Sequence, residues 1–431
     1  MEPPQAVWRL VLMSDAAAKF TGDLLSYAPG IHDVVAAADA VPDDATLNAY
    51  ASAATLFAMT PASYPLAAVY LHRALVAAKT AEDALLAQAI QAWHAGNLNQ
   101  AITLFRQRIA MRPDDLASSK ICQLLHLDLG DFDGMVATVR STLPHHRENH
   151  FVLGQLAFAL EEAGHSEEAR PIAIQAAAMA ERSGADDPWS LHACMHVQHR
   201  TGSLSQSIAM VRQFEPLWDR CGSFMRLHAW WHAAIAALDL EQPAVAMALY
   251  DDRLADADPD CVQSLVARVS LLARLRLRGT DVGDRWAPLR HALQERVGDG
   301  INGFLDVHYA YGLALAGQGE KANRAADRLD DLSARTAKAL IAHAEGRSDE
   351  ATAALAILKP QLQRLGGSHE QRQLYELVEL DAALTAGHRA QAAAILRTGR
   401  PTRPPWQQAL ATELDACTTN RGTHETQLQA D

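Results

Sequence analysis

Nineteen histidines are distributed unevenly along the chain, and their spacing is its strongest chemical signal. Nine of them lie in the 88 residues from His145 to His232, where an even distribution would place about four. Two pairs have i, i+4 spacing, His192 with His196 and His228 with His232. Because residues four apart lie on one face of a helix, each pair presents two imidazoles side by side.

The paired histidines have three interpretations. Two imidazoles one turn apart bind a zinc-like divalent ion when another element supplies a third ligand, for which Asp251, His308 and Asp187 are the candidates. Without a metal, the same rings act as general acids or bases or hydrogen-bond a polar ligand. The third interpretation is structural, with the rings capping helices and satisfying buried polar groups. We favour the ligand or catalytic pocket without a metal and keep the other two open.

Aromatic side chains fall in the same part of the chain. Trp189, Trp218, Trp230, Trp231 and Tyr250 are the members of this group. They would wall a pocket for a ligand. Core packing is the better explanation for at least three of them, because large aromatic side chains dominate the interior of most folds.

Two segments further along add charged candidates. Asp284 and Arg285 follow a turn, where a surface or capping role is the default for both. In the segment Gly366 to Arg372, Ser368 and Gln371 have the spacing of a capping box at a helix start. That leaves His369 and Arg372 without a local explanation, and an arginine beside a histidine suits a carboxylate or phosphate.

Helix pairs that recur along the chain must position these residues. A glycine-polar turn is followed five residues later by a small residue, first at Gly96 with Ala101. Equivalent turns begin at residues 130, 164, 202 and 241, at intervals of 34, 34, 38 and 39, and later turns fall at 279, 319, 346 and 387. Glycine ends the first helix in a left-handed cap, and the small residue lets the second helix approach closely. The pattern predicts degenerate tetratricopeptide-type repeats.

The repeats define the expected organisation. Residues 1–80 are predicted to form an N-terminal helical capping region, residues 81–417 the repeat solenoid, and residues 418–431 a polar, disordered tail. Alternating runs rich in β-branched residues are missing, which argues against a sheet. Glycine-rich phosphate loops and the nucleophile elbow of hydrolases are also missing from the sequence. The predicted fold class is an all-α solenoid of tetratricopeptide-like helix-turn-helix repeats.

Composition narrows the class of partner. The 431 residues are 49% hydrophobic, 21% charged and 6% aromatic, and the formal net charge is -13. A strongly negative chain is poorly suited to phosphate backbones or anionic lipid, so we expect neither nucleic acid nor a membrane as partner. We expect a small polar molecule or a short peptide, and a homodimer stays open.

The cysteines and the N-terminus bear on compartment. The five cysteines are an odd number without C-x-x-C spacing, which favours a reducing compartment over a disulfide framework or a thiolate metal cage. Met1 to Phe20 lacks a basic segment followed by a long apolar stretch, and nowhere do about 18 apolar residues follow one another. The sequence therefore predicts a cytoplasmic location.

A family resemblance rests on residues from Gly96 to Leu384. They include the run from Phe158 to Gly164, Asp187 with Trp189, His192 and His196, the run Trp230-Trp231-His232 with His228, Tyr250-Asp251, Gly283 to Trp286, His308, and Gly366 to His369 with Gln371-Arg372. In these the chain resembles a bacterial member of the tetratricopeptide repeat protein 38 family, although Ala229 and Ala273 depart from the family pattern. The resemblance implies a helical-repeat fold, and it implies no reaction.

Together these observations predict a histidine-rich pocket that binds, and in one version converts, a small polar molecule or short peptide. The alternative is a non-catalytic scaffold whose groove holds a peptide of a partner protein. The candidate catalytic residues are His192, His196, His228, His232, Asp251 and His308, of which the first four are also the candidate metal ligands. The candidate ligand-binding residues are Asp187, Trp189, Trp231, Tyr250, Arg285, His369 and Arg372.

Overall fold

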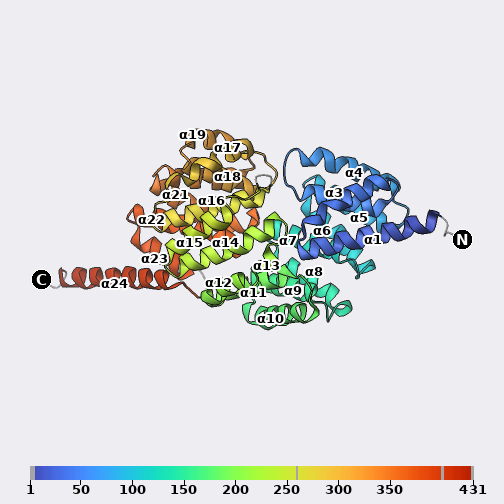
Figure 1. The fold of residues 1–431 in the computed structure, drawn as a ribbon. Helices are drawn as coiled ribbons and strands as arrows, with labels where there is room; N and C mark the ends of the chain where they lie inside the picture. Colours follow the sequence, from blue (N-terminus) through green and yellow to red (C-terminus); the bar gives the residue numbers. More distant parts are fainter. Residues whose placement is uncertain (1–4, 259–260, 399–401, 429–431) are drawn as a thin grey trace. The chain divides into compact units, whose positions relative to one another are not determined.

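Pairs of helices follow one another along the chain in the computed structural model, which describes residues 5–258, 261–398 and 402–428 (Figure 1). A residue in the left-handed conformation ends the first helix of successive pairs. Gly96, Gly130 and Gly164 have φ values of 75°, 66° and 87°. The N–H of the residue after each glycine donates to a carbonyl five residues earlier, at distances of 2.8 to 2.9 Å. This bond satisfies a carbonyl that the end of the helix leaves open, so the glycine fixes where the pair turns.

Two turns differ from the glycine rule. The turn predicted at residue 241 has a glutamate, and Glu241 adopts the left-handed conformation, with φ 60°. The turn predicted at Gly319 lies two residues earlier, because Gly317 is the left-handed residue there, with φ 81°, and Gly319 begins the next helix. Only the position of that turn was wrong, since the small residue five places after Gly317 is Ala322, which is fully buried.

The small residues that follow the turns are buried as predicted. A side chain larger than alanine or serine at these places would hold the second helix away from the first. All of them have no exposed surface: Ala101, Ala169, Ser207, Ala246, Ala351 and Ala392.

The helices group into two compact units, each of which we describe by itself. Unit 1 comprises residues 5–197 and 214–229. In it, paired helices pack as α3 with α4, α5 with α6, α7 with α8, and α9 with α10. Its elements are α1 (Gln5–Ser26), η1 (Pro29–His32), α2 (Asp33–Ala40), α3 (Ala45–Leu56), α4 (Ser63–Ala77), α5 (Ala81–His94), α6 (Leu98–Met111), α7 (Leu116–Leu129), α8 (Phe132–Thr142), η2 (Leu143–His145), α9 (His150–Glu162), α10 (Ser166–Ser183), most of α11 (Pro188–Thr201), α13 (Glu215–Trp218) and the first turns of α14 (Ser223–Asp239).

Unit 2 comprises residues 198–213, 230–258, 263–398 and 402–428. In it, α18 packs with α19 and α20, α20 with α21, and α22 with α23. Its further elements are α12 (Leu204–Gln213), α15 (Pro243–Leu249), the π-helical turn η3 (Tyr250–Leu254), α16 (Val262–Leu277), η4 (Gly283–Trp286), α17 (Ala287–Arg296), α18 (Gly303–Leu315), α19 (Gly319–Ala326), α20 (Asp331–Ala344), α21 (Ser348–Leu358), η5 (Lys359–Leu365), α22 (His369–Thr385), α23 (Arg389–Thr398) and α24 (Pro405–Leu428).

The predicted fold class is confirmed, because the described residues form helix-turn-helix pairs and contain no strand. Within the predicted capping region, residues 1–80, α3 and α4 form a pair of the same kind as those that follow. Helix α24 continues through residues 418–428 of the segment predicted as a disordered tail, since no proline interrupts it after Pro405. Residues 1–4 and 429–431 lie outside the described part. Among the described helices, none combines the length and apolar character needed to cross a bilayer.

A buried carboxyl in unit 2 gives the fold a testable pH dependence. Asp306 in α18 is 2% exposed, and its Oδ1 accepts a hydrogen bond from the Gly300 N–H at 3.2 Å. Burial, with smaller contributions from Asp299 and Asp330, raises the pKa of Asp306 from 3.8 to about 6. Since the folded state holds the proton more tightly, this group stabilises the fold below pH 3.8, and that contribution is lost as the pH rises through 6.

Asp306→Asn keeps the acceptor oxygen and removes the charge. We expect it to raise the free energy of unfolding by about 2 to 3 kcal/mol at pH 7.5, from the size of the pKa shift, and to leave it unchanged near pH 3.5. Urea denaturation at the two pH values measures both, and Asp331→Asn, at an exposed position of α20, is the control. An equal effect of Asp306→Asn at both pH values would mean that its charge is not what matters.

Candidate functional site

Helix α11 of unit 1 owes its start to two residues. Pro188 opens it, where a missing N–H costs nothing, and Asp187 precedes it with Oδ1 accepting the Ser190 N–H at 3.0 Å. The other oxygen of Asp187 accepts from the Ser190 hydroxyl at 2.5 Å and lies 2.7 Å from His150 Nδ1. Asp187, a candidate ligand-binding residue, thus fixes the helix that carries His192 and His196.

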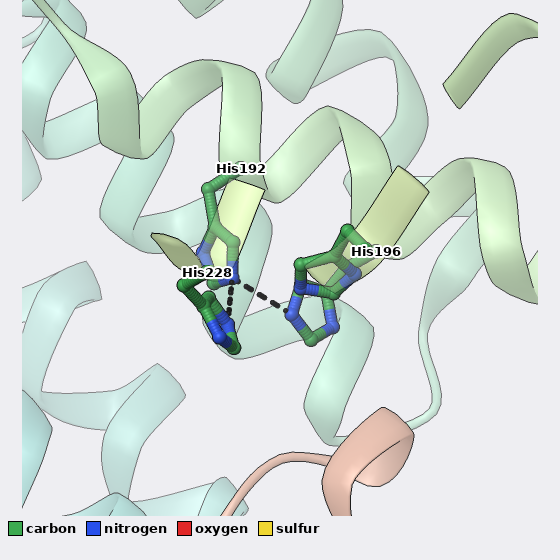
Figure 2. A group of neighbouring side chains, drawn as sticks. His192, His196 and His228 are labelled. Carbon is green, nitrogen blue, oxygen red and sulfur yellow. Dashed lines mark hydrogen bonds between the residues drawn. The ribbon is translucent and has the colours of Figure 1, made fainter. Parts of the chain in front are cut away.

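Three of the predicted histidines meet with the same ring nitrogen facing inward (Figure 2). His192 Nε2 lies 3.1 Å from His196 Nε2 and 3.1 Å from His228 Nε2. The first two rings come from α11 and the third from the first turns of α14, and all three are buried. One ligand atom of each lies within 4.8 Å of the others. The predicted convergence of the i, i+4 histidines is therefore present for His192, His196 and His228.

Two consecutive carboxylates lie behind His196. Glu161 Oε2 and Glu162 Oε1, at the end of α9, are each 3.4 Å from His196 Nδ1, and all three side chains have no exposed surface. A carboxylate on Nδ1 sets the imidazole tautomer, so that Nε2 is left to face the cluster.

The surroundings drive the basicity of two rings in opposite directions. Burial alone would lower the pKa of His196, but hydrogen bonds and charge from Glu161 and Glu162 outweigh it and raise the pKa to about 10. Burial, aided by the charge on His196, lowers the pKa of His228 to about 3. The cluster therefore combines a ring that holds a proton with one that releases it, an arrangement found in acid/base pairs.

Aromatic rings pack around the three histidines. Phe158 meets His196 edge-on at 5.0 Å and stacks on His192 at 5.5 Å between ring centroids. Trp189 lies 4.8 Å from His192, and Phe224 stacks on His228 at 5.0 Å. These contacts fix the ring orientations and lower the local dielectric.

The space between the histidines suits an ion better than an organic molecule. Nitrogens bound to a tetrahedral zinc ion at about 2.0–2.1 Å are roughly 3.3 Å apart, close to the two separations of 3.1 Å at His192. Each neutral imidazole Nε2 carries one hydrogen or one lone pair. His192 Nε2 cannot therefore make two good hydrogen bonds to two other ring nitrogens, whereas a cation would accept lone pairs from all three.

The fourth predicted histidine lies one helical turn beyond His228 on α14. His232 is buried, and within unit 2 its ring is 5.2 Å from that of His199 and 5.0 Å from that of Trp231. Trp231, a candidate ligand-binding residue, also has the Arg274 guanidinium 5.8 Å above its ring.

Two other candidates pair with each other in unit 2. Arg285 donates to both oxygens of Asp251, at 2.7 and 2.6 Å, and both side chains are partly exposed. This is a forked ion pair near the surface, which lowers the pKa of Asp251. Tyr250 beside them is buried, and burial raises its pKa to about 12.

His308 of α18 is a buried base with a fixed tautomer. Its Nδ1 lies 2.7 Å from the Phe304 carbonyl, so Nδ1 carries the hydrogen. Burial lowers the pKa of His308 to about 4. The ring packs at 5.7 Å from that of Tyr375 within unit 2.

The candidates at the start of α22 contact each other. Ser368 and Gln371 form the predicted capping box, which is confirmed. Arg372 Nη2 lies 3.2 Å from His369 Nδ1, and Nη1 donates to the Gly367 carbonyl. The pair is half-buried, and the Gly367 contact directs the guanidinium toward the turn.

All five aromatic residues that were weighed as pocket walls are buried. They are Trp189, Trp218, Trp230, Trp231 and Tyr250. Their burial agrees with core packing, and Trp189 also contacts His192 of the cluster in unit 1.

Sequence reasoning missed three buried charged residues of unit 1. Glu161 and Glu162 precede the turn at Gly164, and two adjacent acids on a helix of otherwise apolar residues are the signal that could have found them. Lys120 interrupts the apolar face of α7 and has no exposed surface. Buried acids and lysines are rare unless partnered, so each of these demands an explanation.

The contacts of Lys120 do not compensate for the cost of burying a charged ammonium group. Its Nζ is 3.1 Å from the centroid of the Trp189 ring, 5.1 Å from that of Tyr27 and 3.3 Å from Gln123 Oε1. A desolvated cation–π contact contributes about 2 kcal/mol, less than the several kcal/mol that removing an ammonium from water costs. Burial therefore lowers the pKa of Lys120 well below its usual value, and the charge of Asp187 opposes this only in part.

The residue that covers Lys120 has an unusual backbone. Tyr27 follows the last residue of α1 with φ 52°, a left-handed conformation that costs a tyrosine roughly 1–2 kcal/mol. Its carbonyl accepts the Gly222 N–H at 2.7 Å. The Tyr27 and Trp189 rings stack at 5.3 Å with 10° between their planes.

Comparison with known proteins adds no site. The chain matches no model of a known protein family. Among solved structures it is similar to that of Naa15/Naa10 bound to HypK-THB, at 13% identity over 92% of this chain and 69% of that one, with a TM-score of 0.24. It is also similar to the crystal structure of yeast Tom70, at 13% identity over 95% of this chain and 88% of that one, with a TM-score of 0.33. Likeness at this level carries no argument about a ligand or partner.

The effect of Glu161 and Glu162 on the pKa of His196 can be tested. In metal-free protein, replacing both by glutamine removes what holds the His196 proton, so its pKa falls from about 10 to below the ordinary histidine value of about 6.5. Ring nitrogen shifts followed by NMR against pH measure this. Because the pKa of His196 is raised in the folded state, its proton stabilises the fold below the unfolded-state pKa, and this stability is lost as the pH rises through 10. The wild type should therefore lose stability above pH 6.5 more steeply than the double variant does. A His196 pKa that does not change would mean that the carboxylates do not act on the ring.

Proposed function

We propose that the chain is a metal-binding helical-repeat protein whose functional centre is the cluster of His192, His196 and His228, and that a zinc-like divalent ion held there takes a small polar molecule as its further ligand. The observation that carries the proposal is the approach of three Nε2 atoms to one point, with His192 Nε2 3.1 Å from each of the other two. On this observation we prefer a metal site to the metal-free pocket that the spacing of the histidines alone favoured.

The residues behind the cluster support this choice. Imidazoles that bind metals commonly give their second nitrogen to a carboxylate, which orients the ring and raises its basicity. Glu161 and Glu162 stand in that relation to His196. A purely structural histidine pair would gain little from two buried acids, because burying each carboxylate is costly.

Three imidazoles leave an open position on a tetrahedral ion, as in catalytic rather than structural zinc sites. Such an ion acts as a Lewis acid that polarises an oxygen of its ligand. The fourth position would be open to the small polar molecule. With His196 bound to the ion through Nε2, Glu161 and Glu162 would hold the remaining hydrogen on its Nδ1.

The finer predictions from the sequence stay proposals. These are the tetratricopeptide repeat protein 38 family, the cytoplasmic location, the homodimer and the roles of Asp251, His308, Arg285, His369 and Arg372. The scaffold alternative, a groove that holds a partner's peptide, also stays a prediction, and no contact described above favours it over a metal centre.

Metal content is the direct test. Protein produced without an affinity tag, dialysed against zinc and then freed of loosely bound metal, should retain about one equivalent by elemental analysis. His192→Gln, which removes the shared nitrogen, should abolish retention, and Glu161→Gln with Glu162→Gln should weaken zinc affinity about 10- to 100-fold, as loss of groups behind a ligand does.

His165→Ala is the matched control, because His165 is an exposed histidine in the same part of unit 1. Thermal unfolding of each variant shows whether it folds. Wild-type protein that retains no metal, or retention by His192→Gln equal to that of the control, would overturn the proposal.

A further inference from the structure

A second set of buried groups in unit 1 is not needed for the metal centre. Among the chain's six lysines, Lys120 is the one that is fully buried. Its Nζ lies 3.1 Å from the Trp189 ring centroid and 5.1 Å from that of Tyr27. Its one hydrogen bond runs to the amide oxygen of Gln123, at 3.3 Å, and no described carboxylate forms an ion pair with it.

We propose that Lys120 is a reactive amine, and that unit 1 uses it to bind a small aldehyde as an imine on the face of Trp189. The argument begins with the charge state of the amine, because only an unprotonated amine attacks a carbonyl carbon.

The groups that face Lys120 favour its unprotonated form. Gln123 comes from its own helix, Tyr27 from the end of α1, and Trp189 from α11, and none of them is an anion at neutral pH. Asp187, at the start of α11, acts on the amine only at a distance and is engaged by His150 and the Ser190 hydroxyl. From α9 the nearest contact is through the Gln155 carbonyl, which accepts from Gln123. Lysines in such surroundings are the ones that form imines in proteins.

The reaction needs no partner beyond the aldehyde. The Nζ lone pair forms a bond to the carbonyl carbon, and the carbonyl oxygen takes up one of the two amine hydrogens. That oxygen then leaves as water with the second amine hydrogen, and a carbon–nitrogen double bond remains. The imine formed in this way is neutral, because the burial that disfavours the charged amine acts on the imine nitrogen as well. It therefore adds no charge to the buried surroundings of Trp189 and Tyr27.

Tyr27 supplies the second polar group. Its hydroxyl is buried and has no hydrogen-bond partner among the described residues, whereas the residue as a whole, backbone included, is partly exposed. The hydroxyl is available to hydrogen-bond the departing oxygen. Tyr27 combines a left-handed backbone with a ring 5.1 Å from Lys120 Nζ, and strained residues of this kind gather at functional sites.

The same surroundings set the class of ligand. Asp187 is the nearest carboxylate, so an oxo acid would bring a second negative charge beside it. An uncharged aldehyde avoids that repulsion, and the flat faces of Trp189 and Tyr27 suit a short apolar chain.

Reductive alkylation tests the proposal. The protein, stripped of metal with EDTA, is treated with propionaldehyde and cyanoborohydride at pH values from 6 to 9, and the alkylated lysines are located by peptide mass spectrometry. At pH 7 an ordinary exposed lysine is unprotonated in roughly one molecule in 2,500. We expect Lys120 to react at least ten-fold faster than Lys338 at pH 7. Its rate should rise less steeply with pH than that of an ordinary exposed lysine, which rises about ten-fold per unit.

Variants separate the adduct from general reactivity. Tyr27→Phe keeps the ring and removes the hydroxyl, so it should slow labelling of Lys120 alone, while Lys338→Met, at an exposed position, should leave Lys120 labelling unchanged. Because metal is absent throughout, the result does not depend on the histidine cluster. Labelling of Lys120 that is absent, or that rises with pH in parallel with Lys338, would overturn the proposal.

Discussion

Close contact between the two helices of each pair is the constraint on which the rest of the structure depends. Neither helix can bury its apolar face alone, so the second must approach the first within the length of a short side chain. A left-handed residue reverses the chain, and at turns such as Gly96 and Gly164 a buried alanine five places later receives the neighbouring helix. Where glycine is absent, at Glu241, the backbone adopts the left-handed conformation all the same, which shows that the packing sets the turn and the glycine only eases it.

Tight packing explains why the polar groups of unit 1 are so strongly perturbed. Helices in close contact leave little room for water, and a charged group between them must find its partners among other side chains. Glu161 and Glu162 meet that requirement through His196. Lys120 lies against the Trp189 ring without a carboxylate in contact, and burial lowers the pKa of its amine. The basicity of His196 is thus raised and that of Lys120 lowered within one unit, and in both cases the presence or absence of a carboxylate partner decides the direction.

Much of the fold and part of the site could be predicted from the sequence. The repeat turns could be predicted because glycine and a small residue at fixed distance have one common structural cause, and the displaced turn at Gly317 arose where two glycines stand two residues apart. The convergence of His192, His196 and His228 followed from helical spacing. Spacing could not show that two acids on another helix stand behind His196, nor that Asp251 has Arg285 as its partner, because contacts between distant segments depend on how helices are stacked. Lys120 carried a local signal, a cation on an apolar helix face, whose meaning depends on Trp189 and Tyr27 far away in the chain.

Where a small residue follows a turn, it does so after five places, whereas the interval between successive turns, counted with the turn at Gly317, ranges from 29 to 41 residues. Length variation is thus confined to the connections between helix pairs and to the outer ends of the helices. Such a chain can gain or lose residues there without disturbing any contact inside a pair. Each hairpin behaves as a closed building block, and evolution or protein engineering can lengthen the linkers between blocks while the interior of each stays as it was.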